Sequence, residues 1–170
     1  MEKSPTPFAG IANRDVAHAR GFTLIELMIT VAIVAILSAI ALPVYFDSIR
    51  KSRRSDAITA MAQTQQAEER WRANNATFSS NFGTGELNVD TSGATVTTYT
   101  TSAGYYALTL SDIAGSTYKI LATAQGSQAN DTNCKLMELR VSAGTIEYCS
   151  GSTSGSLSCT SSTNSQCWKR

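Results

Sequence analysis

The pattern of apolar and polar positions sets the N-terminal segment apart from the rest of the chain. From Phe22 to Phe46 the sequence is apolar over 25 residues and carries one charge, the carboxylate of Glu26. As an α-helix rising about 1.5 Å per residue, this run spans roughly 37 Å, which is enough to cross a hydrocarbon core about 30 Å thick. We therefore predict a membrane-spanning helix over residues 22–46.

The helical pattern continues to about Ala73, but its apolar positions become confined to one face. That face consists of Ile49, Ala57, Ala60, Met61, Thr64, Ala67 and Trp71. Pro43 lies inside the helical stretch, and we expect a kink there because proline lacks a backbone N–H group and clashes with the preceding turn. The pattern thus predicts one long helix that is apolar on all sides in its first half and amphipathic in its second.

Strand-like segments come after a long polar connection. Residues 74–104 are rich in Thr, Ser, Gly and Asn and show no clear period, so we predict a loop there. The next segments alternate or run apolar between turn residues, and they are 105–110, 117–123, 135–141 and 145–149. Short consecutive strands favour an antiparallel meander laid on the amphipathic half of the helix. The predicted fold class is α+β, a long N-terminal helix on a roughly four-stranded antiparallel sheet.

All four cysteines lie in the last quarter of the chain, at positions Cys134, Cys149, Cys159 and Cys167. An even number downstream of a membrane helix indicates two disulfides formed outside the cytosol. Three pairings are possible, and the sequence does not choose among them. We favour the nested arrangement, Cys134–Cys167 with Cys149–Cys159, whose outer loop would stabilise the head by roughly 3–4 kcal/mol. The sequential arrangement, Cys134–Cys149 with Cys159–Cys167, stays open because a hairpin could bring its first pair together.

The formal net charge is +1, so no global field indicates nucleic acid or an acidic partner. A local basic cluster lies just after the apolar run, and it consists of Arg50, Lys51, Arg53 and Arg54. Asp47 and Asp56 lie three or four residues from members of the cluster, so helix ion pairs can take up part of its charge. We therefore expect a solvated or subunit-contacting face rather than a phosphate-binding site.

Catalytic chemistry has little support in the sequence. No serine or cysteine has a recognisable base nearby, and no glycine-rich stretch follows a strand and opens a helix. Glu68 and Glu69 are adjacent on the amphipathic helix and are expected to be solvated. Because no CxxC pair occurs and His18 is the only histidine, a metal site is also disfavoured. We predict no enzyme activity, no metal and no cofactor.

Glu26 is the most informative single residue of the apolar run. A lone carboxylate deep in a membrane helix costs about 2.5–3.5 kcal/mol on insertion scales, so it needs a partner. Cleavage after Gly21 would create an amine on Phe22, one helical turn from Glu26. The same amine on a neighbouring subunit could serve instead and would align packed helices.

The sequence Gly21-Phe22-Thr23-Leu24-Ile25-Glu26, preceded by Arg20 and followed by an apolar run, resembles the cleavage and methylation motif of type IV prepilins. The resemblance implies that a prepilin peptidase cuts after Gly21 and methylates Phe22. It further implies that Glu26 recruits the subunit into a growing filament.

The head is similar to the PilE-type minor pilins of Gram-negative bacteria. The likeness rests on residues 54–57, 69–71, 74–75, 77–78, 106–110 and 136–139, and on Asp131, Cys134, Gly144, Cys167 and Trp168. The insert with Cys149 and Cys159 departs from the pattern, because such relatives commonly have only the outer pair. The resemblance implies a type IV pilin fold with a removed leader at 1–21, a membrane and filament-core segment at 22–46 and a head at 47–170.

The implied function is that of a minor pilin, a structural subunit that supports assembly of a type IV pilus and hence adhesion, twitching motility and DNA uptake. The implied partners are other pilin subunits, the prepilin peptidase and methyltransferase, the inner membrane and the pilus assembly machinery. The head would lie in the periplasm before assembly and in the extracellular pilus afterwards. Alternatives are a major pilin, a type II secretion pseudopilin, and a competence pilin that binds DNA. The candidate DNA contacts are Lys119, Lys135, Arg140, Lys169 and Arg170.

Overall fold

The structure is a computed structural model that describes residues 21–160 and 162–169 of the chain. Its internal contacts divide the chain into two compact units, one ending at Ala41 and the other beginning at Leu42. Apart from Gly21, the predicted leader lies outside the described residues.

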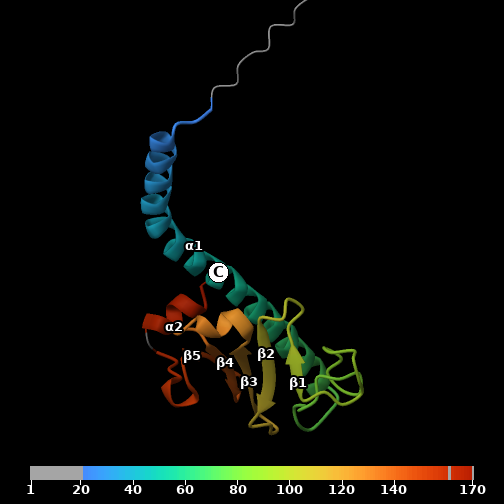
Figure 1. The fold of residues 1–170 in the computed structure, drawn as a ribbon. Helices are drawn as coiled ribbons and strands as arrows, with labels where there is room; N and C mark the ends of the chain where they lie inside the picture. The colour runs from blue at the N-terminus through green and yellow to red at the C-terminus, as the bar shows by residue number, and fades with distance from the viewer. Residues whose placement is uncertain (1–20, 161, 170) are drawn as a thin grey trace, which may run out of the picture. The chain divides into compact units, whose positions relative to one another are not determined.

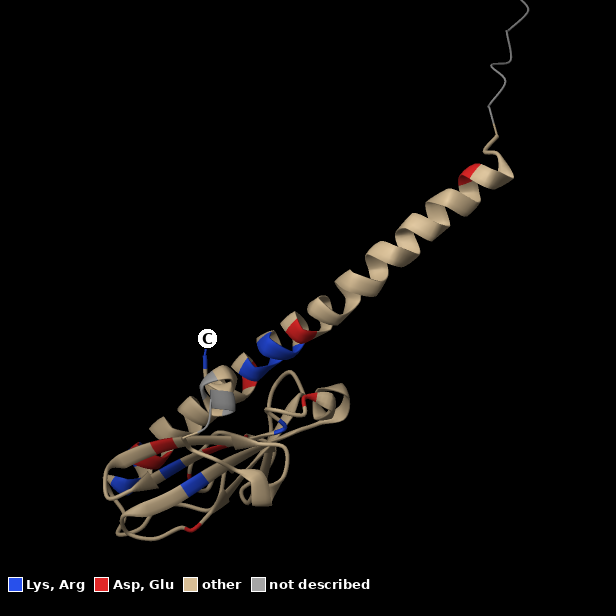
Figure 2. Ribbon diagram, turned by 90° about the vertical axis from the view of Figure 1, so that its left-hand side faces the viewer, with Lys and Arg blue, Asp and Glu red and all other residues tan. Residues whose placement is uncertain are grey.

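Helix α1 runs from Leu24 to Arg72, over 49 residues, and contains Pro43 (Figure 1). Among the described residues it is the one helix long and apolar enough to cross a membrane, with a mean hydropathy of 2.7 over an 18-residue window that has no buried residue. Figure 2 shows that charged positions are sparse along its first half and then occur close together. The predicted long helix is confirmed to within two residues at each end, while the kink at Pro43 stays a prediction.

Within the described residues, five antiparallel strands form one sheet in the order β1-β2-β3-β4-β5. The strands are β1 Thr98–Thr100, β2 Tyr106–Ser111, β3 Thr117–Ala124, β4 Leu136–Ser142 and β5 Thr145–Gly151. Each strand pairs with the next along the chain, so the predicted meander is confirmed. The turn between β4 and β5 consists of Ala143 and Gly144, both with positive φ (48° and 82°), as tight two-residue hairpins require.

The core lies between the sheet and the second half of α1, which runs behind the strands in Figure 1. Every second residue of β3, from Tyr118 to Ala124, is buried, and the register pairs Tyr118 with Val141 on β4. Directly paired residues share one face of a sheet, so this face is continuously apolar. Ala57 and Ala60 of α1 are buried in the same cluster, so the amphipathic half of the helix covers this face of the sheet.

Strand β1 is a difference from the predicted four strands, because it lies in the segment expected to be loop. It is only three residues long and depends on pairing with β2, where Tyr99 is opposite Leu108. The Tyr99 ring also packs on Phe82, with ring centroids 5.9 Å apart. Because these contacts are made across the fold, the local sequence carries only a weak signal for the strand.

The connection from α1 to β1 is held together by one amide side chain. Asn81 Oδ1 accepts hydrogen bonds from the N–H groups of Gly83 (2.8 Å) and Val96 (2.7 Å), and Asn81 Nδ2 donates to the carbonyl of Ala94 (2.8 Å). Gly83 is required here, since a Cβ atom at that position would lie 2.5 Å from the carbonyl oxygen of Gly93. The loop is therefore a packed part of the head.

The C-terminal part of the chain contains two 3₁₀ turns and a short helix. The turns are η1 Gly126–Asn130 and η2 Ser154–Ser156, and the helix is α2 Ser162–Cys167. Trp168 follows α2, donates its Nε1–H to the carbonyl of Cys149 (3.2 Å) and packs its ring on Tyr148 (4.7 Å between centroids). The C-terminal segment is therefore held by packing on β5 as well as by the disulfides.

Candidate functional site

The start of helix α1 shows the predicted processing residues outside regular structure. Gly21 and Phe22 precede the helix, and the Phe22 residue is 83% exposed. Thr23 caps the helix, because its Oγ1 accepts the backbone N–H of Glu26 at 3.2 Å, as an N-cap threonine does. The carboxylate of Glu26 lies in the first turn, where the helix dipole favours negative charge. A peptidase would find the Gly21–Phe22 bond on an accessible segment ahead of the helix.

The apolar first half of α1 exposes its large side chains within the structure. Each large apolar residue from Phe22 to Phe46 is at least 50% exposed. Exposed apolar surface of this extent marks a site of contact with a membrane or with other proteins. The segment therefore has no role in the core of the head and is free to contact lipid or neighbouring helices.

The basic cluster is divided between solvent and the head. Lys51 pairs with Asp47 at 2.9 Å on the exposed helix surface, as predicted. Arg53 does not join Asp56, because its guanidinium lies over the Tyr105 ring (4.3 Å to the centroid) and donates to Ser127 Oγ at 2.8 Å. The expectation of a wholly solvated or subunit-contacting face is thus wrong for part of the cluster.

Arg54 is the clearest departure, since it is buried and forms a two-point ion pair with Asp131. Its Nε donates to Asp131 Oδ2 at 2.7 Å and its Nη2 donates to Oδ1 at 2.9 Å. The two side chains are only 6% and 4% exposed. The Asp131 carboxylate also accepts the N–H of Cys134 (3.3 Å) and the side-chain amide of Gln128 (3.1 Å). This network fixes α1 to the segment that enters the disulfide region. Arg54 and Asp131 are 77 residues apart in the sequence, so local sequence patterns could not predict that they pair.

The disulfides form the nested arrangement. Cys134 is bonded to Cys167 across a sequence separation of 33 residues, and Cys149 is bonded to Cys159 across 10. Cys134, Cys149 and Cys167 are fully buried. The outer bond joins the start of β4 to the end of α2, and the inner bond closes the loop that comes after β5.

Glu68 contradicts the expectation that Glu68 and Glu69 are solvated. Its side chain is fully buried on the core face of α1, and its Oε2 accepts the backbone N–H of Ser79 at 2.9 Å. Burial raises the pKa of Glu68 to about 7, the Ser79 hydrogen bond opposes the rise, and the charges of Glu86 and Glu69 add to it. Glu69 itself is exposed. The sequence analysis missed the burial of Glu68 because it judged exposure from the residue type. The position of Glu68 beside Ala67, on the packing face of α1, would have indicated burial.

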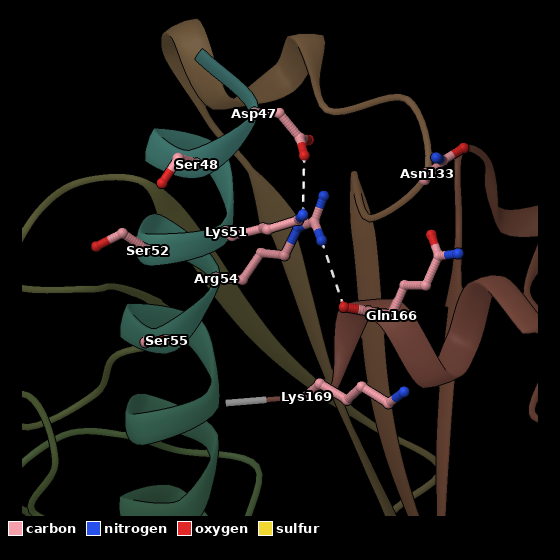
Figure 3. Close-up of a pocket in the computed structure, with 9 residues that line it drawn as sticks. All are labelled: Asp47, Ser48, Lys51, Ser52, Arg54, Ser55, Asn133, Gln166 and Lys169. Atoms are coloured by element: carbon pink, nitrogen blue, oxygen red, sulfur yellow. Dashed lines mark hydrogen bonds and ion pairs between the residues drawn. The ribbon is translucent and has the colours of Figure 1, made fainter. Parts of the chain in front are cut away.

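A groove lies between α1 and the C-terminal segment, with a volume of about 830 Å³. Figure 3 shows Lys51 and Arg54 projecting from α1 toward the C-terminal segment, where Asn133, Gln166 and Lys169 lie. Ser48, Ser52 and Ser55 of α1 complete the lining. Arg54 reaches across and donates to the carbonyl of Gln166 at 3.4 Å. The groove thus has polar walls with lysines on both sides.

The candidate DNA-contacting cations do not form a single group. Lys119 pairs with Asp112, and Arg140 pairs with Glu138, so acidic residues neutralise both on the sheet. Lys169 lines the groove, while Arg170 lies outside the described residues. In the part of the chain that the structure describes, no three His, Cys, Asp or Glu residues form a group that could hold a metal ion.

Comparison with known proteins gives two family matches. The family described as "Type IV minor pilin ComP, DNA uptake sequence receptor" matches residues 43–138, and the "Prokaryotic N-terminal methylation motif" matches residues 17–42. The two matches adjoin without overlap and together cover the apolar segment, the rest of α1 and the sheet as far as the first residues of β4.

Individual relatives are similar over shorter stretches. Fimbrial protein EcpC of Eikenella corrodens is 44% identical over 64 residues, which are 34% of this chain and 42% of that protein. A fimbrial protein of Neisseria meningitidis serogroup A is 44% identical over 62 residues, 36% of each chain. The type IV major pilin PilE1 of Neisseria gonorrhoeae is 59% identical over 39 residues, 23% of this chain and 24% of the pilin. The chain thus spans less than half the length of each of these relatives.

Proposed function

We propose, from the premise that the chain belongs to the family of the type IV minor pilin ComP, that this protein is a minor subunit of a type IV pilus. The observation that carries the proposal is helix α1, whose apolar first half is fully available for contact while its second half forms part of the core of the head. One helix can then serve first as a membrane anchor and later as part of a filament core. The function is structural, and it supports adhesion, twitching motility and DNA uptake through assembly.

Processing involves the same segment. The prepilin peptidase cuts after Gly21 and the new N-terminal Phe22 is methylated, which the match to the methylation motif over residues 17–42 supports. Residues 22–46 anchor the processed chain in the inner membrane, with residues 47–170 in the periplasm. The two disulfides support this orientation because such bonds persist in oxidising compartments. The assembly machinery then transfers the subunit to the pilus.

Glu26 aligns subunits in the filament by pairing with the amine of Phe22 on a neighbouring subunit. Its position in the first turn of α1 leaves the carboxylate near the N-terminal end of the helix, where a neighbour's terminal amine can approach. A buried ion pair is destabilised when one partner is missing. A subunit added at another axial position along the filament would leave the Glu26 carboxylate without its partner, so such addition is disfavoured.

Quantitative mass spectrometry of filaments sheared from producing cells tests the proposal. A peptide that begins with N-methylated Phe22, in trace but reproducible amount relative to other pilins, is the expected result. Dominance of this peptide would make the chain the major pilin. Processed protein that is held in the membrane and absent from pili would indicate a secretion pseudopilin.

DNA binding is a second candidate function, favoured by the description of the matching family as a DNA uptake sequence receptor. Filter binding of duplex DNA to the processed protein, repeated over a series of salt concentrations, tests it. Phosphate contacts predict an affinity that falls steeply as salt rises. A chain with a purely structural role would retain little DNA at any salt concentration.

A further inference from the structure

We propose that the groove between α1 and the C-terminal segment binds the head group of an anionic phospholipid, of the phosphatidylglycerol type, while the subunit is still anchored in the membrane. The groove is the one lined by Lys51 and Lys169 in Figure 3. The inference rests on the proposed function, because it requires residues 22–46 to span a membrane.

The position of the groove on the helix supports a lipid ligand. Residues of α1 from Asp47 to Ser55 line it, and Asp47 directly follows Phe46, the last residue of the apolar run. Along a helix, Lys51 lies about 7.5 Å beyond Phe46. The head-group layer on each side of a hydrocarbon core is roughly 5–7.5 Å thick, so the backbone of Lys51 lies at the outer edge of that layer and its long side chain can reach the lipid phosphates. Tyr45 and Phe46 are exposed, and tyrosine is a typical residue of this interface.

The charges in and around the groove favour an anion. Three cations line the groove, Lys51, Arg54 and Lys169, against the one lining carboxylate of Asp47. Asp131 is occupied by Arg54 and Asp47 by Lys51. Among the described residues, Lys169 has no carboxylate partner. A lipid phosphate would therefore find Lys169 available, and Lys51 on the opposite wall could be shared with Asp47.

The uncharged lining of the groove matches the hydroxyl groups of a glycerol head group. Ser48, Ser52 and Ser55 occupy positions i, i+4 and i+7 and therefore lie on one face of α1. In Figure 3 the hydroxyls of Ser48 and Ser52 point away from the C-terminal segment, whereas the side-chain amides of Asn133 and Gln166 lie on the side of α1 to which Lys51 and Arg54 project. Amide groups both donate and accept hydrogen bonds, so a polyol can be bound beside its phosphate. A choline head group offers no hydroxyl and would gain less.

Native mass spectrometry of the processed full-length protein in detergent tests the proposal, with phosphatidylglycerol and phosphatidylcholine as the two probes. The wild-type protein should bind phosphatidylglycerol more tightly than phosphatidylcholine. Lys51→Gln and Lys169→Gln should each weaken phosphatidylglycerol binding about fivefold, which is the effect of one lysine beside an anionic surface. The double variant should approach the affinity for phosphatidylcholine.

Lys135→Gln is the matched control, because it removes the same charge from the head outside the groove and should leave binding unchanged. Equal affinity for the two lipids, or equal losses in the control and groove variants, would overturn the proposal. Displacement of phosphatidylglycerol by millimolar inorganic phosphate, or by duplex DNA acting through the same lysines, would also overturn it and assign the groove to another ligand. Incorporation into filaments is measured separately, so loss of the lipid site and failure of the pilin function give different results.

Discussion

Arg54 and Glu68 are both ionisable residues buried beside the core of the head, but among the described residues only Arg54 has an ion-pair partner. The guanidinium of Arg54 is matched by the carboxylate of Asp131. Glu68 receives one backbone hydrogen bond, and within the described residues its Oε1 has no hydrogen-bond partner. The phenolic oxygen of Tyr118 is likewise buried without a partner in this part of the chain. Arg54 therefore links α1 to the segment before β4, whereas Glu68 makes the stability of the head depend on pH.

Replacing Arg54 by Met should lower the free energy of unfolding by about 3–5 kcal/mol, because it leaves the buried carboxylate of Asp131 without a partner. The double variant Arg54→Met/Asp131→Leu should recover much of that loss, since no buried charge remains. Urea unfolding of the processed protein in detergent measures both values. Lys51→Gln breaks only the exposed pair with Asp47 and should change stability by less than about 1 kcal/mol. Equal effects of Arg54→Met and Lys51→Gln would show that the buried pair has no special role.

Glu68 should make the head less stable as pH rises. The native state keeps the Glu68 proton up to a pKa of about 7, whereas the unfolded chain releases it near the ordinary pKa of 4.5. Between these values the native state binds more protons, so the contribution of Glu68 to stability is greatest below about pH 4.5 and is lost as pH rises through 7. The total loss is about 3 kcal/mol.

Glu68→Gln should remove this slope, because the amide stays neutral at every pH. The measurement is urea unfolding of wild type and variant from about pH 5 to about pH 8, with the difference between them plotted against pH. Glu69→Gln, an exposed neighbour, is the control and should follow the wild type. Parallel curves for wild type and Glu68→Gln would refute the assignment.

Among the elements, strands β4 and β5 and helix α2 form a unit closed by two disulfides of different loop length. The outer bond encloses nearly all of the C-terminal region, whereas the inner bond encloses only the loop after β5. Asn164 also links parts of this unit, since its Nδ2 donates to the carbonyl of Tyr148 at 2.6 Å. The elements in this region are therefore held by both covalent and polar contacts.

The two disulfides should contribute unequally to stability. Replacing Cys134 and Cys167 together by Ala should cost about 4 kcal/mol, and replacing Cys149 and Cys159 together should cost about 3 kcal/mol, because the longer loop loses more chain entropy. Urea unfolding of the two double variants measures the difference. A larger loss for the inner pair would show that native contacts around η2, and not loop length, determine the effect.

Several elements could be predicted from sequence, and those that could not depend on distant contacts. The apolar run and the four longer strands produce local patterns of their own, whereas the cysteine positions left three pairings open, of which the favoured nested one is present in the structure. Strand β1 required its partner β2, and the Arg54–Asp131 pair joins residues far apart in the chain. Glu68 could have been found, because it follows Ala67 on the helix face that carries Met61 and Thr64. Residue type was given more weight there than helical position.

At the scale of the whole molecule, the proposed function requires the apolar half of α1 to leave a membrane and join other subunits. Glu26→Ala should therefore give processed protein that stays in the membrane and is lost from sheared pili, because the apolar run has no other carboxylate. Immunoblots of membrane and pilus fractions measure the distribution. Glu69→Ala is the matched control, because it removes an exposed carboxylate from the second half of the helix, outside the apolar run. Normal incorporation of the Glu26 variant would remove the proposed role in assembly.

In a pilus under tension, the Cys134–Cys167 disulfide would carry force across the residues between the two cysteines. If the force acts on α1 and on the segment after α2, it passes from one sulfur atom to the other and bypasses the chain between them. The sequence separation of 33 residues between them could otherwise extend to about 110 Å. Even if strands β4 and β5 came apart under load, residues 134–167 could not lengthen while this disulfide is intact. Reduction would release that segment, so the oxidised head would have a shorter maximum extension than the reduced head.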